Sequence, residues 1–216
     1  MNKKCHSCGL INFADSKTCL RCGKFINSSA PRKRRITRSM ILKRIFVLIA
    51  VCAGAISVFY GSLVYSADPL SYEEKELVEN AIALIDEKGF AFEAFLLRYV
   101  TVFRGNDNWL NASVEKENAF AATNFPFEIV TLYPDFFMYT ADDVERAAIL
   151  LHEAKHLQGN DETEAYGFVW KHRKQLGWNV ETHGQSELFQ NVRRQTLFYA
   201  PNIFICEFNP AGDCTH

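Results

Sequence analysis

Twenty-one consecutive residues without a charge, Ile45 to Tyr65, divide the chain and limit what each part can fold into. A helical run of this length spans a bilayer, because about 20 residues with a rise of about 1.5 Å each cover a hydrocarbon core of about 30 Å. Tyr60 and Tyr65 lie near its end, where aromatic rings favour the membrane–water interface. The run therefore predicts a single transmembrane helix over residues 45–65, with separate folded segments before and after it.

Charge is distributed unevenly about this run, and the asymmetry predicts its orientation. Residues 1–44 contain 12 of the 24 Lys and Arg residues and one acid, whereas residues 45–216 contain 24 of the 25 acids. The linker 27–44 includes the densest basic stretch, residues 31–35. Basic residues beside a transmembrane helix remain in the cytoplasm. The N-terminus is therefore expected to be cytoplasmic and residues 68–216 extracytoplasmic, in a single-pass protein of the cytoplasmic membrane.

The basic linker is expected to contact the lipid bilayer and not nucleic acid. The linker is short, adjoins the predicted helix and contains no recognition helix, so anionic headgroups are its expected partner. The 44 residues before the run are too many for the basic region of a cleaved signal. Val51 precedes Cys52 where a lipoprotein site requires a small residue, so the run is predicted to be an anchor.

Four cysteines near the N-terminus form two C-x-x-C pairs. Cys5 and Cys8 are separated from Cys19 and Cys22 by ten residues. Each pair can turn two thiolates toward one ion, and the two pairs complete a tetrahedral site. Residues 1–26 therefore predict a zinc ribbon with one structural zinc, and they resemble the short ribbons at the N-terminus of many bacterial membrane proteins.

Residues 150–157 contain the pattern H-E-x-x-H, two histidines four residues apart. In a helix His152 and His156 lie on one face, one turn apart, where two imidazoles can hold one zinc ion. Glu153 follows the first histidine and can reach a water bound to that ion. The pattern predicts a catalytic zinc site on this helix.

A second predicted helix follows, beginning near Asp161, and it carries the candidates for a third ligand. Here the chain resembles the zincin metallopeptidases, in their gluzincin-like branch, where a glutamate in the pattern E-x-x-A completes the site. Glu162 fits this pattern because Ala165 follows it by three residues. Glu164 is the rival ligand, and Asp161 is a weaker one. Tyr166 departs from the Asp or His that the family often has at the next position.

The resemblance implies a mainly α domain with a small β-sheet, an α+β zincin-like fold, over residues 68–216. His152, His156 and Glu162 would hold a catalytic zinc, and Glu153 would act as general base toward an activated water. The implied activity is that of a metallohydrolase, most closely a peptidase, with a protein or peptide substrate in the cell envelope. The alternative is a zincin-like domain that binds a partner without cutting it. Four residues are unranked candidates for stabilising an oxyanion: Tyr166, His172, His183 and Tyr199.

Local patterns predict the elements around the metal helix. A capping box at residues 71–74 opens a helix that extends to about Lys88. Alternating β-branched and aromatic residues predict a strand over 125–133, and the resemblance places an edge strand there that pairs with extended substrate. Thr140 is the expected N-cap of the metal helix, and a further helix is expected over 186–199.

The last two cysteines, Cys206 and Cys214, flank a turn-rich segment that contains Asn, Pro and Gly. A segment of this kind can bring its two ends together. Because disulfides persist in oxidising compartments, an exported domain predicts a Cys206–Cys214 disulfide.

Reporter fusions at the two ends of the chain test the predicted orientation. A reporter that is active only after export should be active when fused after residue 216 and silent when fused after residue 30, because the basic linker holds the N-terminal side in the cytoplasm. The reverse pattern would invert the topology and would also remove the basis for the disulfide.

Overall fold

The structure is a computed structural model that describes three ranges of the chain: residues 2–26, 38–113 and 120–204. Within these ranges the protein is mainly helical with two small sheets, which confirms the coarse fold class expected from the sequence. The predicted Cys206–Cys214 disulfide and the basic stretch 31–35 lie outside the described residues, so both stay predictions.

The chain divides into two units, residues 1–53 and 54–216. The N-terminal unit begins with an antiparallel pair of short strands: β1 (Lys3–Lys4) and β2 (Ile11–Asn12). Its buried apolar cluster consists of three residues: Cys5, Cys19 and Ile26. A core this small cannot offset the conformational entropy of the chain, so the fold of the unit depends on a cross-link or a metal ion.

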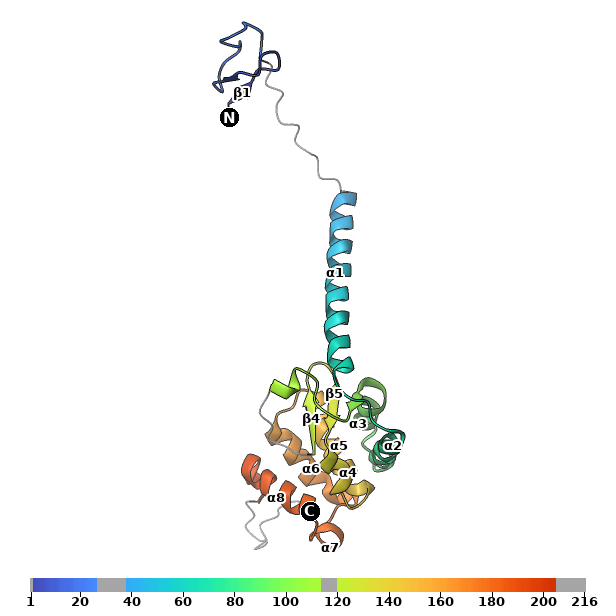
Figure 1. Ribbon diagram of the computed structural model, residues 1–216. Helices are drawn as coiled ribbons and strands as arrows, with labels where there is room; N and C mark the ends of the chain where they lie inside the picture. The colour runs from blue at the N-terminus through green and yellow to red at the C-terminus, as the bar shows by residue number, and fades with distance from the viewer. Residues whose placement is uncertain (1, 27–37, 114–119, 205–216) are drawn as a thin grey trace. The chain divides into compact units, whose positions relative to one another are not determined.

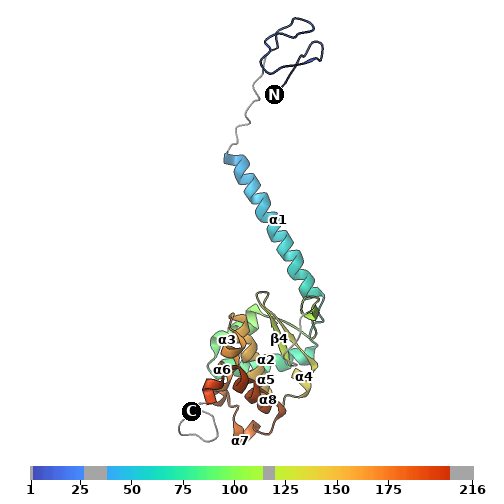
Figure 2. The same cartoon turned by 90° about the vertical axis from the view of Figure 1, so that its left-hand side faces the viewer.

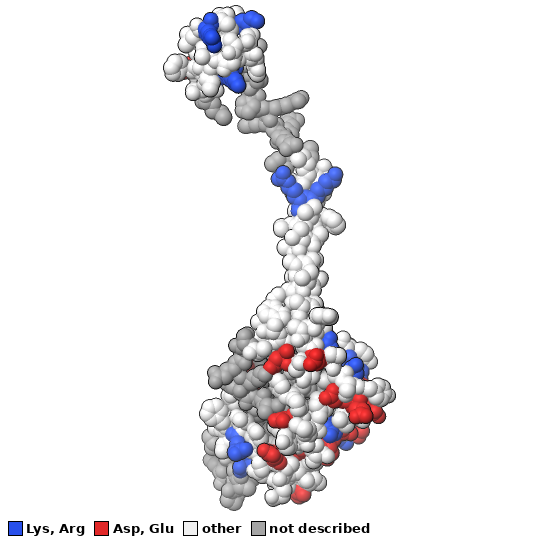
Figure 3. Space-filling model, viewed as in Figure 1, with Lys and Arg blue, Asp and Glu red and all other residues white. Residues whose placement is uncertain are grey.

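Helix α1 (Arg38–Tyr65) is long and apolar enough to cross a membrane. It contains 28 residues, and its most apolar window has a mean hydropathy of 2.2. Figure 3 shows Lys and Arg near its N-terminal end and no charged side chain along the rest of the visible helix. Most of its side chains are exposed, which an apolar helix tolerates in lipid and not in water.

The C-terminal domain, which we define as residues 66–204, opens with α2 (Tyr72–Glu87). The predicted capping box is present, because the Ser71 hydroxyl accepts from the Glu74 N–H and the Glu74 carboxylate accepts from the Ser71 N–H. Three short elements follow α2: α3 (Ala91–Phe95), the π-helix η1 (Leu96–Val100) and β3 (Val102–Arg104). A 3-10 turn, η2, covers Asn111–Ser113.

Three strands form a mixed sheet in the order β3–β5–β4. The central strand, β5 (Ile129–Leu132), is parallel to β3 and antiparallel to β4 (Ala121–Asn124). The predicted strand over 125–133 is therefore wrong in its first half, where residues 125–128 form the turn between β4 and β5. Pro126 has no N–H to donate to a ladder, so the alternating pattern does not continue as a strand. The expected edge position is also wrong for the 125–133 pattern, since β5 is the central strand and β4, one of the two edge strands, packs against the metal helix.

The metal helix is α5 (Asp143–Leu157), which runs through the middle of the domain in Figure 1 and Figure 2. Helices α2 and α6 and strand β4 pack around it. Its N-cap is Asp142, so the prediction of Thr140 is wrong. The Thr140 hydroxyl instead donates to the Phe136 carbonyl at 2.8 Å and ends the preceding helix, α4 (Pro134–Met138).

Four further elements complete the domain: α6 (Glu162–Leu176), α7 (Val180–His183), α8 (Glu187–Tyr199) and the 3-10 helix η3 (Pro201–Phe204). Asp161 and Ser186 are the N-caps of α6 and α8, which confirms the two helices expected there. Trp170, Trp178 and Phe189 pack together in the core with ring centroids 5.1–6.5 Å apart. Large aromatic rings of this kind hold α6 and α8 against each other.

Most side chains of α5 are buried, so its polar residues need partners inside the domain. Lys155 is 6% exposed, pairs with Glu93 of α3 and lies 3.6 Å from the centroid of the Phe168 ring. Glu145 is fully buried and accepts a hydrogen bond from the Ser186 hydroxyl. These contacts determine how α5 is rotated relative to its neighbours.

Removing one partner of the Lys155–Glu93 pair is expected to cost more stability than removing both. Glu93→Ala leaves a buried ammonium unpaired and should lower the free energy of unfolding by about 3–5 kcal/mol, whereas Glu93→Leu combined with Lys155→Met should recover most of the loss. Urea unfolding of the full chain in detergent measures both changes. Equal destabilisation by the single and the double variant would contradict this account.

The same pair predicts a pH dependence. Burial raises the pKa of Glu93, but its contact with Lys155 outweighs burial and holds the pKa below its ordinary value. The stabilisation is therefore complete above the ordinary pKa and is lost as the pH falls through the lowered pKa. Glu93→Leu/Lys155→Met should reduce this acid-dependent loss of stability.

Candidate metal centres

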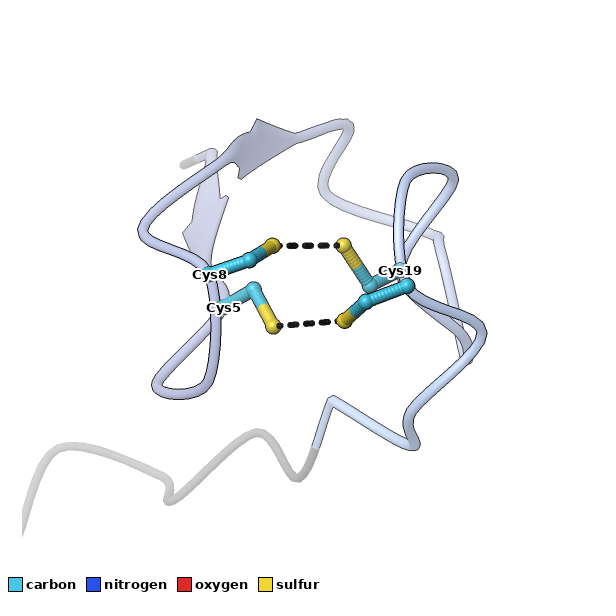
Figure 4. A group of neighbouring side chains, drawn as sticks. Cys5, Cys8 and Cys19 are labelled. Carbon is cyan, nitrogen blue, oxygen red and sulfur yellow. Dashed lines mark hydrogen bonds between the residues drawn. The ribbon is translucent and has the colours of Figure 1, made fainter.

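The four N-terminal cysteines converge on one point, as Figure 4 shows for three labelled members. The Sγ atoms of Cys5 and Cys22 are 3.6 Å apart, and those of Cys8 and Cys19 are 3.5 Å apart. Tetrahedral coordination with Zn–S bonds of about 2.3 Å separates the sulfurs by about 3.8 Å. A disulfide would need about 2.05 Å. The cluster can therefore hold a metal ion.

The backbone favours thiolates at Cys5 and Cys19, whereas at Cys8 a backbone N–H is outweighed by the neighbouring sulfurs and burial, which raise the pKa to about 11. N–H groups that follow Cys19 hold its pKa at about 6, and those that follow Cys5 also lower the pKa of that thiol. Gly9 and Gly23 close the two knuckles with φ of 75° and 68°, a conformation that favours glycine. The sequence analysis missed Asn12, which is 3% exposed and whose amide nitrogen lies 3.7 Å from Cys19 Sγ. Asn12 lies in the ten-residue spacer between the two cysteine pairs, and the spacing of the cysteines does not indicate it.

A second cluster lies between α5 and α6. His152 and His156 face each other with their Nε2 atoms 3.0 Å apart. Glu162, the first residue of α6, lies 3.3 Å from His152 Nε2 through Oε2 and 3.4 Å from His156 Nε2 through Oε1. Gly159 turns the chain between the helices with φ of 81°, and the Asp161 N-cap starts α6 so that its first residue meets the histidine pair.

The geometry of this cluster fits a zinc ion. Bonds of about 2.0–2.1 Å at tetrahedral angles separate ligand atoms by about 3.3 Å, close to the three observed distances. Glu162 Oε2 is buried without a hydrogen-bond partner among the described residues. An orphaned carboxylate oxygen beside two imidazole nitrogens is costly unless a cation joins them. His152, His156 and Glu162 can therefore supply three ligands to one metal ion.

A carbonyl outside the motif orients one of the imidazoles. His156 Nδ1 lies 3.0 Å from the carbonyl oxygen of Asn160, which can only accept a hydrogen bond. Nδ1 therefore carries a proton, and in the neutral ring Nε2 presents its lone pair to the cluster. This is the tautomer that a metal ligand requires.

The charges within the cluster shift its ionisation. Burial lowers the pKa of His156, but its contact with Glu162 and the charge of Glu153 outweigh burial and raise the pKa to about 9. Burial raises the pKa of Glu162, but its contacts with both histidines outweigh burial and lower the pKa to about 2. These shifts show that the carboxylates stabilise a positive charge at the histidine pair. A metal ion that binds there at neutral pH would displace a proton from His156.

The other two candidate ligands lie outside this cluster. The Glu164 side chain is exposed, and the Asp161 carboxylate accepts a hydrogen bond from the Glu164 N–H at 3.0 Å. Asp161 thus serves as the N-cap of α6, and the structure brings only Glu162 of the three acids to the histidine pair.

Glu153 is buried at 2% exposure and is held by a residue that the sequence analysis missed. The Thr123 hydroxyl, on edge strand β4, donates to Glu153 Oε2 at 2.6 Å. This bond occupies one carboxylate oxygen and orients the other. Thirty residues separate the pair along the chain, so no local pattern indicates it.

Two of the four candidate oxyanion stabilisers lie at the cluster. The Tyr166 ring has its centroid 4.3 Å from that of His152, and it stacks on Tyr199 at 5.4 Å. His183 instead bonds to the N-cap of α5 at 3.0 Å, and His172 bonds to a carbonyl of its own helix at 2.8 Å. Tyr166 is therefore the candidate that the structure places directly against a histidine of the cluster.

No family model, curated protein or solved structure matches the chain. The geometry of the two clusters therefore carries what can be inferred about function.

Zinc content of the purified full chain tests the ligand set. We expect two ions per chain, falling to one in His152→Ala, His156→Ala or Glu162→Gln, because an amide is a poorer ligand for a dication than a carboxylate. Glu164→Gln is the matched control and should retain both ions. Cys5→Ser should lose the N-terminal ion alone. Two ions in Glu162→Gln with one in Glu164→Gln would transfer the ligand role to Glu164.

Proposed function

We propose that the protein is a membrane-anchored zinc metallohydrolase of the peptidase class. In this proposal α1 is the anchor, residues 1–26 are a zinc ribbon in the cytoplasm, and the C-terminal domain acts outside the cytoplasmic membrane. The observation that carries the proposal is the convergence of His152, His156 and Glu162 at separations of 3.0–3.4 Å, with the charge of Glu153 acting on His156.

The two clusters support different roles for zinc. Four thiolates fill a tetrahedral ion, so the N-terminal site is proposed to be structural. Two histidines and one glutamate leave a fourth position for water or substrate, which is the arrangement of catalytic sites. When bound there, zinc would lower the pKa of a coordinated water to about 7 and polarise the substrate carbonyl.

Glu153 is the proposed general base. Its carboxylate would accept a proton from the attacking water at the oxygen that Thr123 leaves available. It would then deliver that proton to the departing amine. Thr123 acts as a positioning residue, because its hydroxyl holds the carboxylate in one orientation. Burial of Glu153 keeps water from competing for that carboxylate.

The edge strand β4 supports a peptide substrate over other hydrolysable compounds. Among the described strands β4 pairs only with β5, so its outer edge presents backbone N–H and C=O groups. An extended peptide can add to such an edge as a further strand. Because Thr123 lies on β4 and contacts Glu153, a peptide bound there would run close to the base.

Separating the base from the ligands tests the proposal. Glu153→Gln should retain two zinc ions and lose about 10²–10⁴-fold in hydrolysis of an unstructured protein substrate, because an amide cannot take up the proton. Thr123→Val should also retain zinc, and its rate of hydrolysis should fall by about tenfold or more because the hydrogen bond to the Glu153 carboxylate is missing. Thr123→Ser should restore the rate because it retains the hydroxyl.

The same assay distinguishes the enzyme from a non-catalytic binding domain. A parent protein that holds both zinc ions and cuts none of a broad set of unstructured substrates would favour the binding domain. If the parent protein bound no zinc at the histidine cluster, the metallohydrolase proposal would be wrong.

A further inference from the structure

The C-terminal domain contacts the last two turns of α1. The ring of Phe59 has its centroid 5.6 Å from that of Trp109 and 5.4 Å from that of Phe127. Trp109 Nε1 donates to the Ser62 hydroxyl at 3.2 Å, and Leu63 is fully buried. The domain therefore begins to pack on α1 before the apolar run ends.

The length of the apolar run then determines where the membrane boundary falls. Lys43 and Arg44 precede the run and limit its start. If the domain stood clear of the bilayer, only the 14 residues 45–58 would remain to cross it, about 21 Å against a hydrocarbon core of about 30 Å. A full crossing needs the helix through Tyr65, which places Phe59 about 9 Å inside the boundary.

We propose that two loops of the C-terminal domain, residues 105–110 and 125–128, insert into the interface of the bilayer that α1 crosses, with their aromatic rings in the outer part of the hydrocarbon core. We call them the interfacial loops. Their contact partner Phe59 lies below the boundary, so the rings of Trp109 and Phe127 reach membrane depth with it. Trp109 is still 49% exposed, and tryptophan favours the membrane interface.

The composition of the interfacial loops sets their depth. Phe125 is 58% exposed and offers a second apolar ring to lipid. The loops also contain Asp107 and Glu128, and ionised carboxylates are tolerated among headgroups and are costly in hydrocarbon. The loops therefore insert shallowly, with aromatic rings directed toward the acyl chains and acids at headgroup level.

The second interfacial loop also approaches the turn that follows α5. Phe125 Cζ lies 3.7 Å from the position that a Cβ on Gly159 would occupy, three residues after His156. Phe127, which contacts Phe59 of α1, is two residues from Phe125, at most about 7 Å between Cα atoms. The metal cluster therefore lies close to the bilayer surface. On the proposed function, its substrates are peptide segments held at that surface, such as the membrane-proximal segments of anchored proteins.

Quenching by brominated lipids measures the depth of Trp109. The full chain is reconstituted in vesicles of phosphatidylcholine and phosphatidylglycerol whose bromines lie near the headgroup. The other two tryptophans, Trp170 and Trp178, are at most 1% exposed in the domain core. We expect a quenched fraction of the emission that disappears in Trp109→Phe.

A second tryptophan position supplies the matched control. Val180 is 63% exposed in α7, which lies at the end of the domain away from α1 in Figure 1 and Figure 2. Val180→Trp in the Trp109→Phe background should show no quenching. Unquenched Trp109 in protein that floats with the vesicles overturns the proposal and leaves the anchor intact. Protein that does not float overturns both.

The depth measurement does not require zinc or hydrolysis, so Glu153→Gln should give the same quenching. The substrate class is tested with one cleavable peptide attached to an acyl chain through spacers of about four or about thirty flexible residues. The short spacer should be cut at least as fast as the long one. Cleavage only through the long spacer would overturn the membrane-proximal substrate class. Absence of all cleavage would remove the proposed function, and the quenching would still decide whether the interfacial loops insert.

Discussion

The fold depends on burying α5 on nearly all sides although the helix carries ionisable residues. Ala147, Ala148 and Ala154 allow neighbouring elements to approach closely, and the low dielectric that results makes each unpaired polar group costly. Lys155 and Glu145 are satisfied by partners on other elements. On the histidine side, three ligand atoms lie together and one oxygen of Glu162 is buried without a hydrogen-bond partner among the described residues. The candidate site therefore lies where a bound cation would supply the partner that this buried oxygen lacks.

The β4–β5 hairpin connects three parts of the protein that are far apart in sequence. Its edge strand carries Thr123, which orients the carboxylate of Glu153. Its turn contacts Gly159 through Phe125 and α1 through Phe127. A shift of this hairpin would alter the orientation of Glu153 and the packing of α1 together. The proposed chemistry and the proposed membrane contact thus depend on one small supersecondary element.

The two candidate metal clusters differ in the number of ligands that the protein supplies. The cysteine cluster offers four thiolates on a small unit with almost no apolar core, so a metal there contributes chiefly to folding. The histidine cluster offers three groups inside a domain that already has a large core. A metal bound there would therefore not be needed to hold the domain together, which fits the proposed role in chemistry.

Features that depend on a few neighbouring residues were determined by the sequence alone. The uncharged run, the capping box at residues 71–74 and the spacings of the cysteines and of His152 and His156 all follow from local geometry along the chain. Tertiary structure alone decided the partners of these residues. Thr123 reaches Glu153 only because a sheet packs on α5, and Lys155 meets Glu93 only because α3 packs on the same helix. Such contacts join residues tens of positions apart, and their free energy comes from packing that no local pattern encodes.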